Sequence, residues 1–160
     1  HGSTIRSSQG LPAGVHYSFA TAPQMDGLLV PGGQGTRREV ANAALLDFLR
    51  RQSEGAAWVA SVCTGAALLA KAGILDGRRA TTNKIAFEWV AAQSTEIDWQ
   101  RRARWVVDGK FWTSSGVSAG TDMALALVEH FYGRATASET ARRAEYVWRD
   151  DPSDDPFAAP

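Results

Sequence analysis

The sequence has little cysteine. Its 160 residues include one, Cys63, so the chain has no internal disulfide and no cysteine cluster for a structural zinc. A single thiol fits a reducing compartment, and we expect a cytoplasmic protein. The three histidines, His1, His16 and His130, are scattered along the chain, and we expect neither a metal nor another cofactor.

Net charge is also lacking. Seventeen basic side chains balance seventeen acidic ones, so we expect no nucleic-acid partner. No apolar stretch approaches the length of a membrane span, and the N-terminus lacks the layout of a signal peptide, so we expect no membrane partner either. The expected partner is a small-molecule substrate or ligand. Residues 1–3 resemble a cloning remnant and are set aside.

Hydrophobic residues make up 44% of the chain, enough at this length for one full core. We therefore expect a single domain over residues 1–160. Its last segment, residues 150–160, holds four aspartates and three prolines. The aspartates lack the alternate spacing and the closing glutamate of a calcium loop. We expect a solvated tail, draped on the surface or loose, rather than a cation site.

Apolar runs typical of buried strands alternate with segments of helical spacing. The expected strands are 15–20, 27–30, 57–62 and 79–82, and then a hairpin of 104–107 and 110–113, in which Asp108-Gly109 would supply two positive φ angles. The expected helices are 41–52, 64–72, 84–93, 122–132 and 137–148. Because the strands are continuously apolar, we predict an α/β fold with a mostly parallel sheet and helices on both faces. In such sheets the ligand pocket lies beyond the carboxyl ends of the strands.

Cys63 stands at such a strand end, in the segment Ser61-Val62-Cys63-Thr64-Gly65. Small residues two positions before and after it permit a sharp strand-to-helix turn, as in a nucleophile elbow. Unpaired N–H groups at the start of the following helix would favour the thiolate, and the Thr64 N–H could bind a developing oxyanion. The alternative is a small core residue, the usual role of a lone cysteine. Its position at a strand end between small residues favours the nucleophile.

The glycine-rich segment 31–35, Pro-Gly-Gly-Gln-Gly, follows the expected 27–30 strand. It lacks the Gly-Lys-Ser/Thr ending of a phosphate loop and the spacing of a dinucleotide site. Two interpretations remain open. The segment is either an ordinary turn, or a bare backbone whose N–H groups, those of Gly32 and Gly33 among them, approach a reacting centre beside Cys63.

Three segments together carry a resemblance: DGLLVPGG at 26–33, VASVCTGAALLAKAGILDGRRATTNK at 59–84 and ARWVVDGKFWTSSGVSAGTDMALALV at 103–128. The chain resembles the ThiJ/PfpI superfamily, in particular the branch of isonitrile hydratases and of the amidotransferase-like sensor domains of AraC-type regulators. The resemblance implies a flavodoxin-like class I glutamine-amidotransferase fold, usually a homodimer, with Cys63 as nucleophile. It also implies an oxyanion pocket formed by the backbone amides of Gly33 and Thr64, and it places Ser114 and Ser115 near the mouth of that pocket.

Two departures from the family pattern affect the chemistry. Family members carry an aspartate or glutamate after their first strand, near the cysteine, and their first strand, helix and second strand have no counterpart in this chain. Several relatives have a histidine after the Thr-Thr pair; here that pocket position holds Asn83, which cannot act as a general base. Loss of the strand would expose sheet edges, so we expect either a truncated chain or a second copy that covers the gap.

Two functions from different classes follow. In the first, the protein is a cysteine-dependent lyase or hydrolase of the isonitrile-hydratase type, in which the Cys63 thiolate attacks an electrophilic carbon and water completes a hydration or hydrolysis. In the second, the fold has lost its acid and serves as a non-catalytic module that binds a small ligand or senses oxidants through Cys63.

Overall fold

The computed structural model describes residues 4–7 and 9–158, so the segment 1–3 set aside above lies outside the described residues. Its main sheet has the strand order β3-β4-β8-β7. Strands β3, β4 and β8 are parallel, and β7 is antiparallel to β8. These strands are β3 (Gly27–Val30), β4 (Trp58–Val62), β7 (Trp105–Asp108) and β8 (Phe111–Ser114). The predicted α/β class with a mostly parallel sheet is confirmed.

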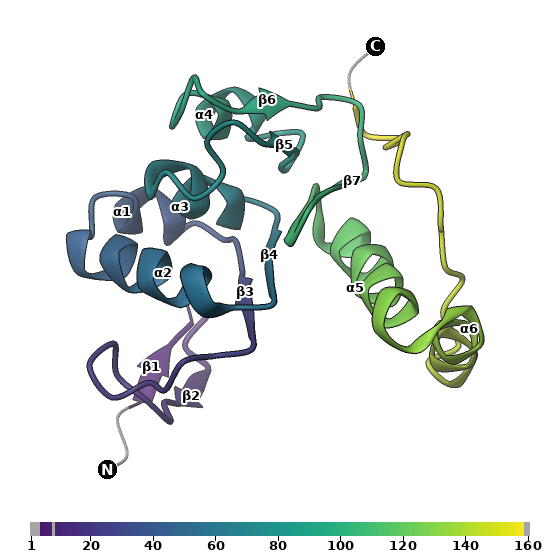
Figure 1. The fold of residues 1–160 in the computed structure, drawn as a ribbon, viewed down its shortest axis with the longest axis horizontal. Helices are drawn as coiled ribbons and strands as arrows, with labels where there is room; N and C mark the ends of the chain where they lie inside the picture. Colours follow the sequence, from purple (N-terminus) through teal and green to yellow (C-terminus); the bar gives the residue numbers. More distant parts are fainter. Residues whose placement is uncertain (1–3, 8, 159–160) are drawn as a thin grey trace.

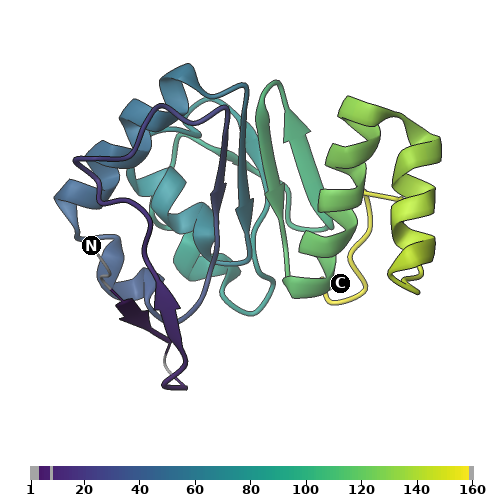
Figure 2. The ribbon, with the colours of Figure 1, turned by 90° about the horizontal axis from the view of Figure 1, so that it is seen from below.

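Helices cover both faces of this sheet (Figure 1). On one face lie α1 (Thr36–Glu39), α2 (Ala43–Gly55) and α3 (Gly65–Lys71). On the other face α5 (Val117–Tyr132) packs on the sheet, and α6 (Arg134–Arg143) packs against α5 (Figure 2). The remaining elements are β1 (Thr4–Arg6), β2 (Pro12–Gly14), β5 (Arg79–Ala80), α4 (Phe87–Ala91) and β6 (Asp98–Trp99).

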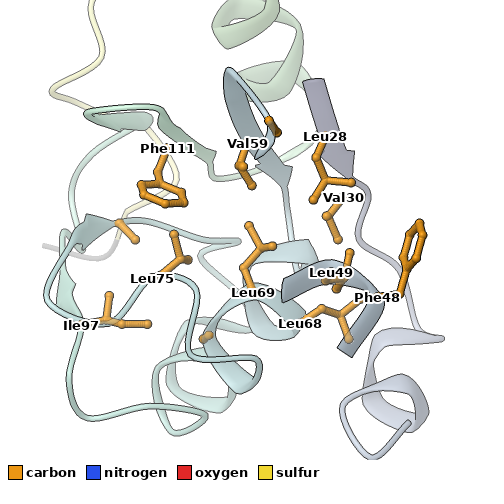
Figure 3. Close-up of a cluster of buried hydrophobic side chains, with 13 residues drawn as sticks. Leu28, Val30, Phe48, Leu49, Val59, Leu68, Leu69, Leu75, Ile97 and Phe111 are labelled. Atoms are coloured by element: carbon orange, nitrogen blue, oxygen red, sulfur yellow. The ribbon is translucent and has the colours of Figure 1, made fainter. Parts of the chain in front are cut away.

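The core has a part on each face of the sheet. Between the sheet and helices α2 and α3, Val59 of β4 packs with Leu28, Leu69 and other apolar side chains (Figure 3). The next residue of β4, Ala60, belongs to a second cluster with Trp112 and residues of α5. Both faces of β4 are therefore buried, which explains why its sequence is apolar at consecutive positions.

Several predicted boundaries differ from the structure. Helix α5 begins at Val117 and α6 spans Arg134–Arg143, so both begin earlier than predicted and α6 also ends earlier. The predicted strand at 15–20 is wrong: its backbone pairs with no strand, and Ser18 instead starts a turn in which its N–H donates to Thr21 Oγ1 at 3.0 Å.

The hairpin turn also differs from the prediction. Asp108 is the last residue of β7 and pairs with Phe111, so the two-residue loop is Gly109-Lys110. Gly109 has a φ of 59° and no positive φ is found at Asp108. A glycine at the first loop position with a single positive φ is the pattern of a type II′ turn rather than of a turn with two positive φ angles.

The acidic tail lies on the surface and is exposed at residues 150–154 and 156–157, as predicted, but one of its aspartates is buried. Asp155 is 3% exposed, its carboxylate accepts from the Ser115 hydroxyl, and it lies 3.9 Å from the Arg104 guanidinium. The backbone N–H of Arg104 donates to the Pro152 carbonyl at 2.8 Å. The tail is thus bound beside the start of β7, by a backbone hydrogen bond and by a buried carboxylate. Among the described residues, no helix has the length and apolar character needed to cross a bilayer.

Candidate functional site

Cys63 lies at the junction of β4 and α3 with a φ of 58°, a left-handed conformation that side chains other than glycine rarely adopt. Hydrogen bonds hold its backbone on both sides: its N–H donates to the Ser114 carbonyl at 3.2 Å, and its carbonyl accepts from Thr82 Oγ1 at 2.8 Å. The side chain is half-buried. This is the strand-turn-helix geometry expected of a nucleophile elbow, and it does not place the thiol in the core.

The neighbouring backbones pass too close for larger residues. A Cβ on Gly65 would lie 2.2 Å from the Val30 carbonyl oxygen, and a Cβ on Gly32 would lie 2.6 Å from the Thr64 nitrogen and 2.9 Å from Cys63 Cβ. The small residue predicted two positions after Cys63 is therefore required by the approach of β3 to α3. Gly32 in turn brings the loop after β3 directly against the cysteine.

The Gly33 amide is engaged by a side chain. Its N–H donates to Thr64 Oγ1 at 2.9 Å, and the Thr36 hydroxyl donates to the same oxygen at 3.1 Å. The amides of Gly32 and Thr64 have no hydrogen-bond partner among the described residues. Of the three backbone groups expected to bind an oxyanion, Gly32 and Thr64 are the two whose amides are free to do so in this structure.

A cavity of about 570 Å³ opens beside Cys63. The Gly32-Gly33 loop and Thr64 form one part of its lining, and Gln9, Gln34, Arg37, Asn83, Ile85 and Ala86 form the rest. Arg37 is the one charged side chain among these described residues, and the lining contains no histidine or carboxylate. Sequence reasoning missed Arg37, because its position in the cavity depends on how α1 packs against α3 and on the contact of Arg37 with Trp89 of α4.

Asn83 lines this cavity as the resemblance implied, but its Oδ1 accepts the Ala86 N–H at 3.0 Å and so stabilises the turn before α4. Ser114 and Ser115 do not line it. The Ser114 hydroxyl is buried and donates to the Ser61 carbonyl at 3.3 Å. Ser115 lines a neighbouring cavity of about 240 Å³, which shares Asn83 and Ile85 with the first.

Lys84 lines this second cavity and is another residue that sequence reasoning missed. Its ammonium donates to Thr81 Oγ1 at 3.0 Å and to the Ala103 carbonyl at 2.5 Å. Burial lowers the pKa of Lys84 to about 8, and the nearby Asp155 carboxylate only partly opposes this effect. The position directly after Asn83 was the signal available in the sequence. Across the described part of the chain, no group of three or more His, Cys, Asp or Glu side chains could hold a metal ion.

Comparison with known proteins gives a consistent result. The family model described as DJ-1/PfpI matches residues 1–130. The isonitrile hydratase of Pseudomonas putida is 37% identical over 143 residues, which are 89% of this chain and 61% of the hydratase. The transcriptional regulator GbdR of Pseudomonas aeruginosa is 31% identical over 83% of this chain and 36% of its own length. The chain thus spans about three fifths of the hydratase and about a third of the regulator.

Solved structures agree with this comparison. A ThiJ/PfpI family protein from Pseudomonas syringae superposes with a TM-score of 0.77 at 31% identity, and the match covers 98% of this chain and 62% of that one. DJ-1beta of Drosophila melanogaster gives a TM-score of 0.77 at 22% identity over 92% of this chain and 80% of its own, which is a likeness of fold alone.

Proposed function

Because this chain belongs to the DJ-1/PfpI family, we propose that Cys63 is a nucleophile that acts on a small electrophile, as in a hydration of the isonitrile-hydratase type. The observation that carries the proposal is the conformation of Cys63. A residue other than glycine is held in the left-handed region by hydrogen bonds on both sides, and its half-buried thiol faces a cavity. Backbone strain of this kind concentrates at functional sites.

The reaction on an isonitrile balances with water as the only co-reactant. The Cys63 thiolate forms a bond to the terminal carbon, which then takes a proton, leaving a thioformimidate on the enzyme. Water adds to that carbon, and the carbon–sulfur bond breaks as the thiolate leaves. The product is an N-substituted formamide in which the oxygen and both hydrogens come from water, one hydrogen on carbon and one on nitrogen. In this proposal the amides of Gly32 and Thr64, which have no partner among the described residues, stabilise negative charge that develops during the reaction.

A second function is supported by the regulator relatives and by the cavity lining. The described lining contains no histidine or carboxylate that could move protons, and relatives of the chain include transcriptional regulators. In this second proposal the domain binds a small ligand, or reacts with an oxidant at Cys63, without turnover. In either case we infer a cytoplasmic location from the single cysteine, and a homodimer from the open sheet edge described in the Discussion.

The test compares the reactivity of Cys63 with turnover. We expect iodoacetamide to alkylate Cys63 at neutral pH faster than it alkylates a free cysteine derivative, with the adduct located by mass spectrometry. Turnover of isonitriles, amides and glyoxals by the wild type and by Cys63→Ser then separates the two proposals. Turnover that is lost in Cys63→Ser supports the enzyme, and rapid alkylation without turnover supports the binding or sensing module. A thiol no more reactive than the free derivative would contradict both the enzyme and a sensor that reacts through Cys63.

A further inference from the structure

The charge in the lining of the Cys63 cavity is positive only, among the described residues. Among its described lining residues, Arg37 alone is charged, and no acidic side chain faces it there. Arg37 also forms no salt bridge with any described residue. The adjacent Arg38 differs in this respect, because its guanidinium lies 2.7 Å from Glu39 and its side chain is 86% exposed. The positive charge at the cavity is therefore not paired with a carboxylate of the described residues.

The Arg37 side chain is placed by an aromatic ring. Its guanidinium carbon lies over the ring of Trp89, 4.7 Å from the ring centroid, so the cation is attracted to the aromatic face. A guanidinium held in this way keeps its N–H donors at the edge of the plane, where they can form two parallel hydrogen bonds to a planar anion. The described residues provide no acceptor for those donors.

We propose that the Cys63 cavity selects electrophiles that carry a carboxylate or a similar planar anion, and that Arg37 binds this anionic group while the electrophilic carbon meets Cys63. This inference rests on the proposed function, because it assumes that Cys63 attacks the bound molecule. Arg37 is then a residue that determines specificity. Its role does not depend on whether the product of that attack is then released by turnover.

Two alkylating reagents of nearly the same size test the inference. Iodoacetate carries a carboxylate and iodoacetamide a neutral amide, and both alkylate the same thiol. We expect Arg37→Gln to lower the ratio of the iodoacetate rate to the iodoacetamide rate about fivefold, the effect of one exposed charge-assisted contact. Arg37→Lys should retain part of the preference because it keeps the charge. Arg38→Gln is the matched control and should leave the ratio unchanged.

Salt provides a second readout. Raising KCl to about 1 M, where charges are screened within about 3 Å, should lower the rate ratio in the wild type and in Arg38→Gln but not in Arg37→Gln. Equal ratios in the wild type and all three variants would overturn the anion preference and leave the nucleophile intact. Slow alkylation of the wild type by both reagents would instead show that the proposed function has failed. Thermal melts of each variant exclude unfolding as the cause of a changed rate.

Discussion

At the residue scale, Gly32 shows how little space surrounds the cysteine. A methyl group added there would lie 2.8 Å from Thr64 Oγ1 and 2.6 Å from the Thr64 nitrogen, which belongs to the backbone and cannot move aside alone. We expect Gly32→Ala to displace the Cys63 turn, to slow alkylation of Cys63, and to destabilise the fold by about 1–3 kcal/mol. Alkylation kinetics and urea unfolding measure the two effects.

Gly35 is the matched control for this substitution. It lies in the same loop with a φ of −59°, and a Cβ added there would contact nothing within 4 Å. Gly35→Ala should therefore keep both the alkylation rate and the stability of the wild type. Wild-type kinetics in Gly32→Ala would show that the loop is free to move away from Cys63, against the close packing described above.

Lys84 provides a prediction for the pH dependence of stability. Burial lowers its pKa to about 8 from an ordinary value of 10.5, so between these pH values the unfolded chain binds more protons than the folded one. Stability from this group therefore rises as pH increases from about 8 to 10.5, and below pH 8 the full desolvation penalty is present. Lys84→Met removes the penalty. We expect it to be about 1 kcal/mol more stable than the wild type near neutral pH, a value reduced for the partial exposure of the side chain.

Urea unfolding of both proteins across this pH range tests the sign. The difference in unfolding free energy between Lys84→Met and the wild type should shrink as pH rises above about 8. Thr81 Oγ1 keeps its bond to the Gln100 carbonyl at 2.8 Å, whereas the Ala103 carbonyl loses its Lys84 donor and keeps only the Thr81 hydroxyl at 3.3 Å. This loss lowers the gain by the same amount at each pH and does not change its pH dependence. A difference that is constant with pH would show that Lys84 titrates normally.

Sequence reasoning identified site residues where local backbone geometry determined them, and missed them where packing did. The spacing of Ser61, Cys63 and Gly65 follows from one sharp turn, so the sequence alone indicated it. For Lys84 the one signal in the sequence was its position directly after Asn83. Arg37 reaches its cavity because separate segments meet in space, and nothing in its immediate neighbours indicates this. The same limit applies to the Gly33 amide, which is engaged by the side chain of Thr64 from another loop.

At the scale of elements, the tail contains a buried carboxylate that its acidic, proline-rich composition did not indicate. Asp155 is buried with Arg104 and Ser115, and its Oδ1 also accepts the Phe157 N–H at 3.0 Å. Asp155→Asn removes a buried negative charge 3.9 Å from the Arg104 guanidinium, which remains paired with Asp122 at 2.6 Å, and it weakens the bond to Ser115. We expect it to destabilise the fold by about 1–3 kcal/mol, as measured by urea unfolding.

Asp154, one residue earlier, is the control for the tail. Its carboxylate pairs with Arg102, but both side chains are more than half exposed. Such surface pairs contribute little, so Asp154→Asn should change stability by less than about 0.5 kcal/mol. Equal effects of the two substitutions would contradict the assignment of Asp155 as the residue that binds the tail.

Strands β3 and β4 could be predicted from the sequence, whereas the tail and the turn within residues 15–20 could not. Strand β4 is a short apolar run buried on both faces, and β3 is buried at Leu28 and Val30. Hydrophobic pattern predicts buried strands of this kind. The tail and residues 15–20 follow no such pattern. An acidic, proline-rich composition is typical of solvated chain, and it does not indicate that Arg104 supplies a buried positive partner. The hydrophobic pattern therefore predicted the strands of the sheet, but not the turn at residues 18–21 or the contacts of the tail with residues 102–105 and Ser115.

At the scale of the whole molecule, the main sheet is open at one end. Among the described residues, β3 pairs only with β4. Leu28 and Val30 of β3 are buried in the core, whereas Leu29 lies on the opposite face of the sheet and is 56% exposed. Helix α5 covers that face over β4, β8 and β7. Unpaired edge strands with exposed apolar side chains are sites of association, and proteins commonly protect them with lysine.

We therefore predict that the polypeptide of these 160 residues associates through β3, giving a dimer or a larger species in light scattering at micromolar concentration. Leu29→Lys should shift the population toward monomer, since a charge at the edge opposes strand pairing without changing the core residues. Val107→Lys is the control on the opposite edge strand, β7, where the tail already accepts the Trp105 N–H through the Pro152 carbonyl at 3.4 Å; it should leave the mass unchanged. A monomeric wild type, or equal shifts in both variants, would show that the edge of β3 is not the contact surface.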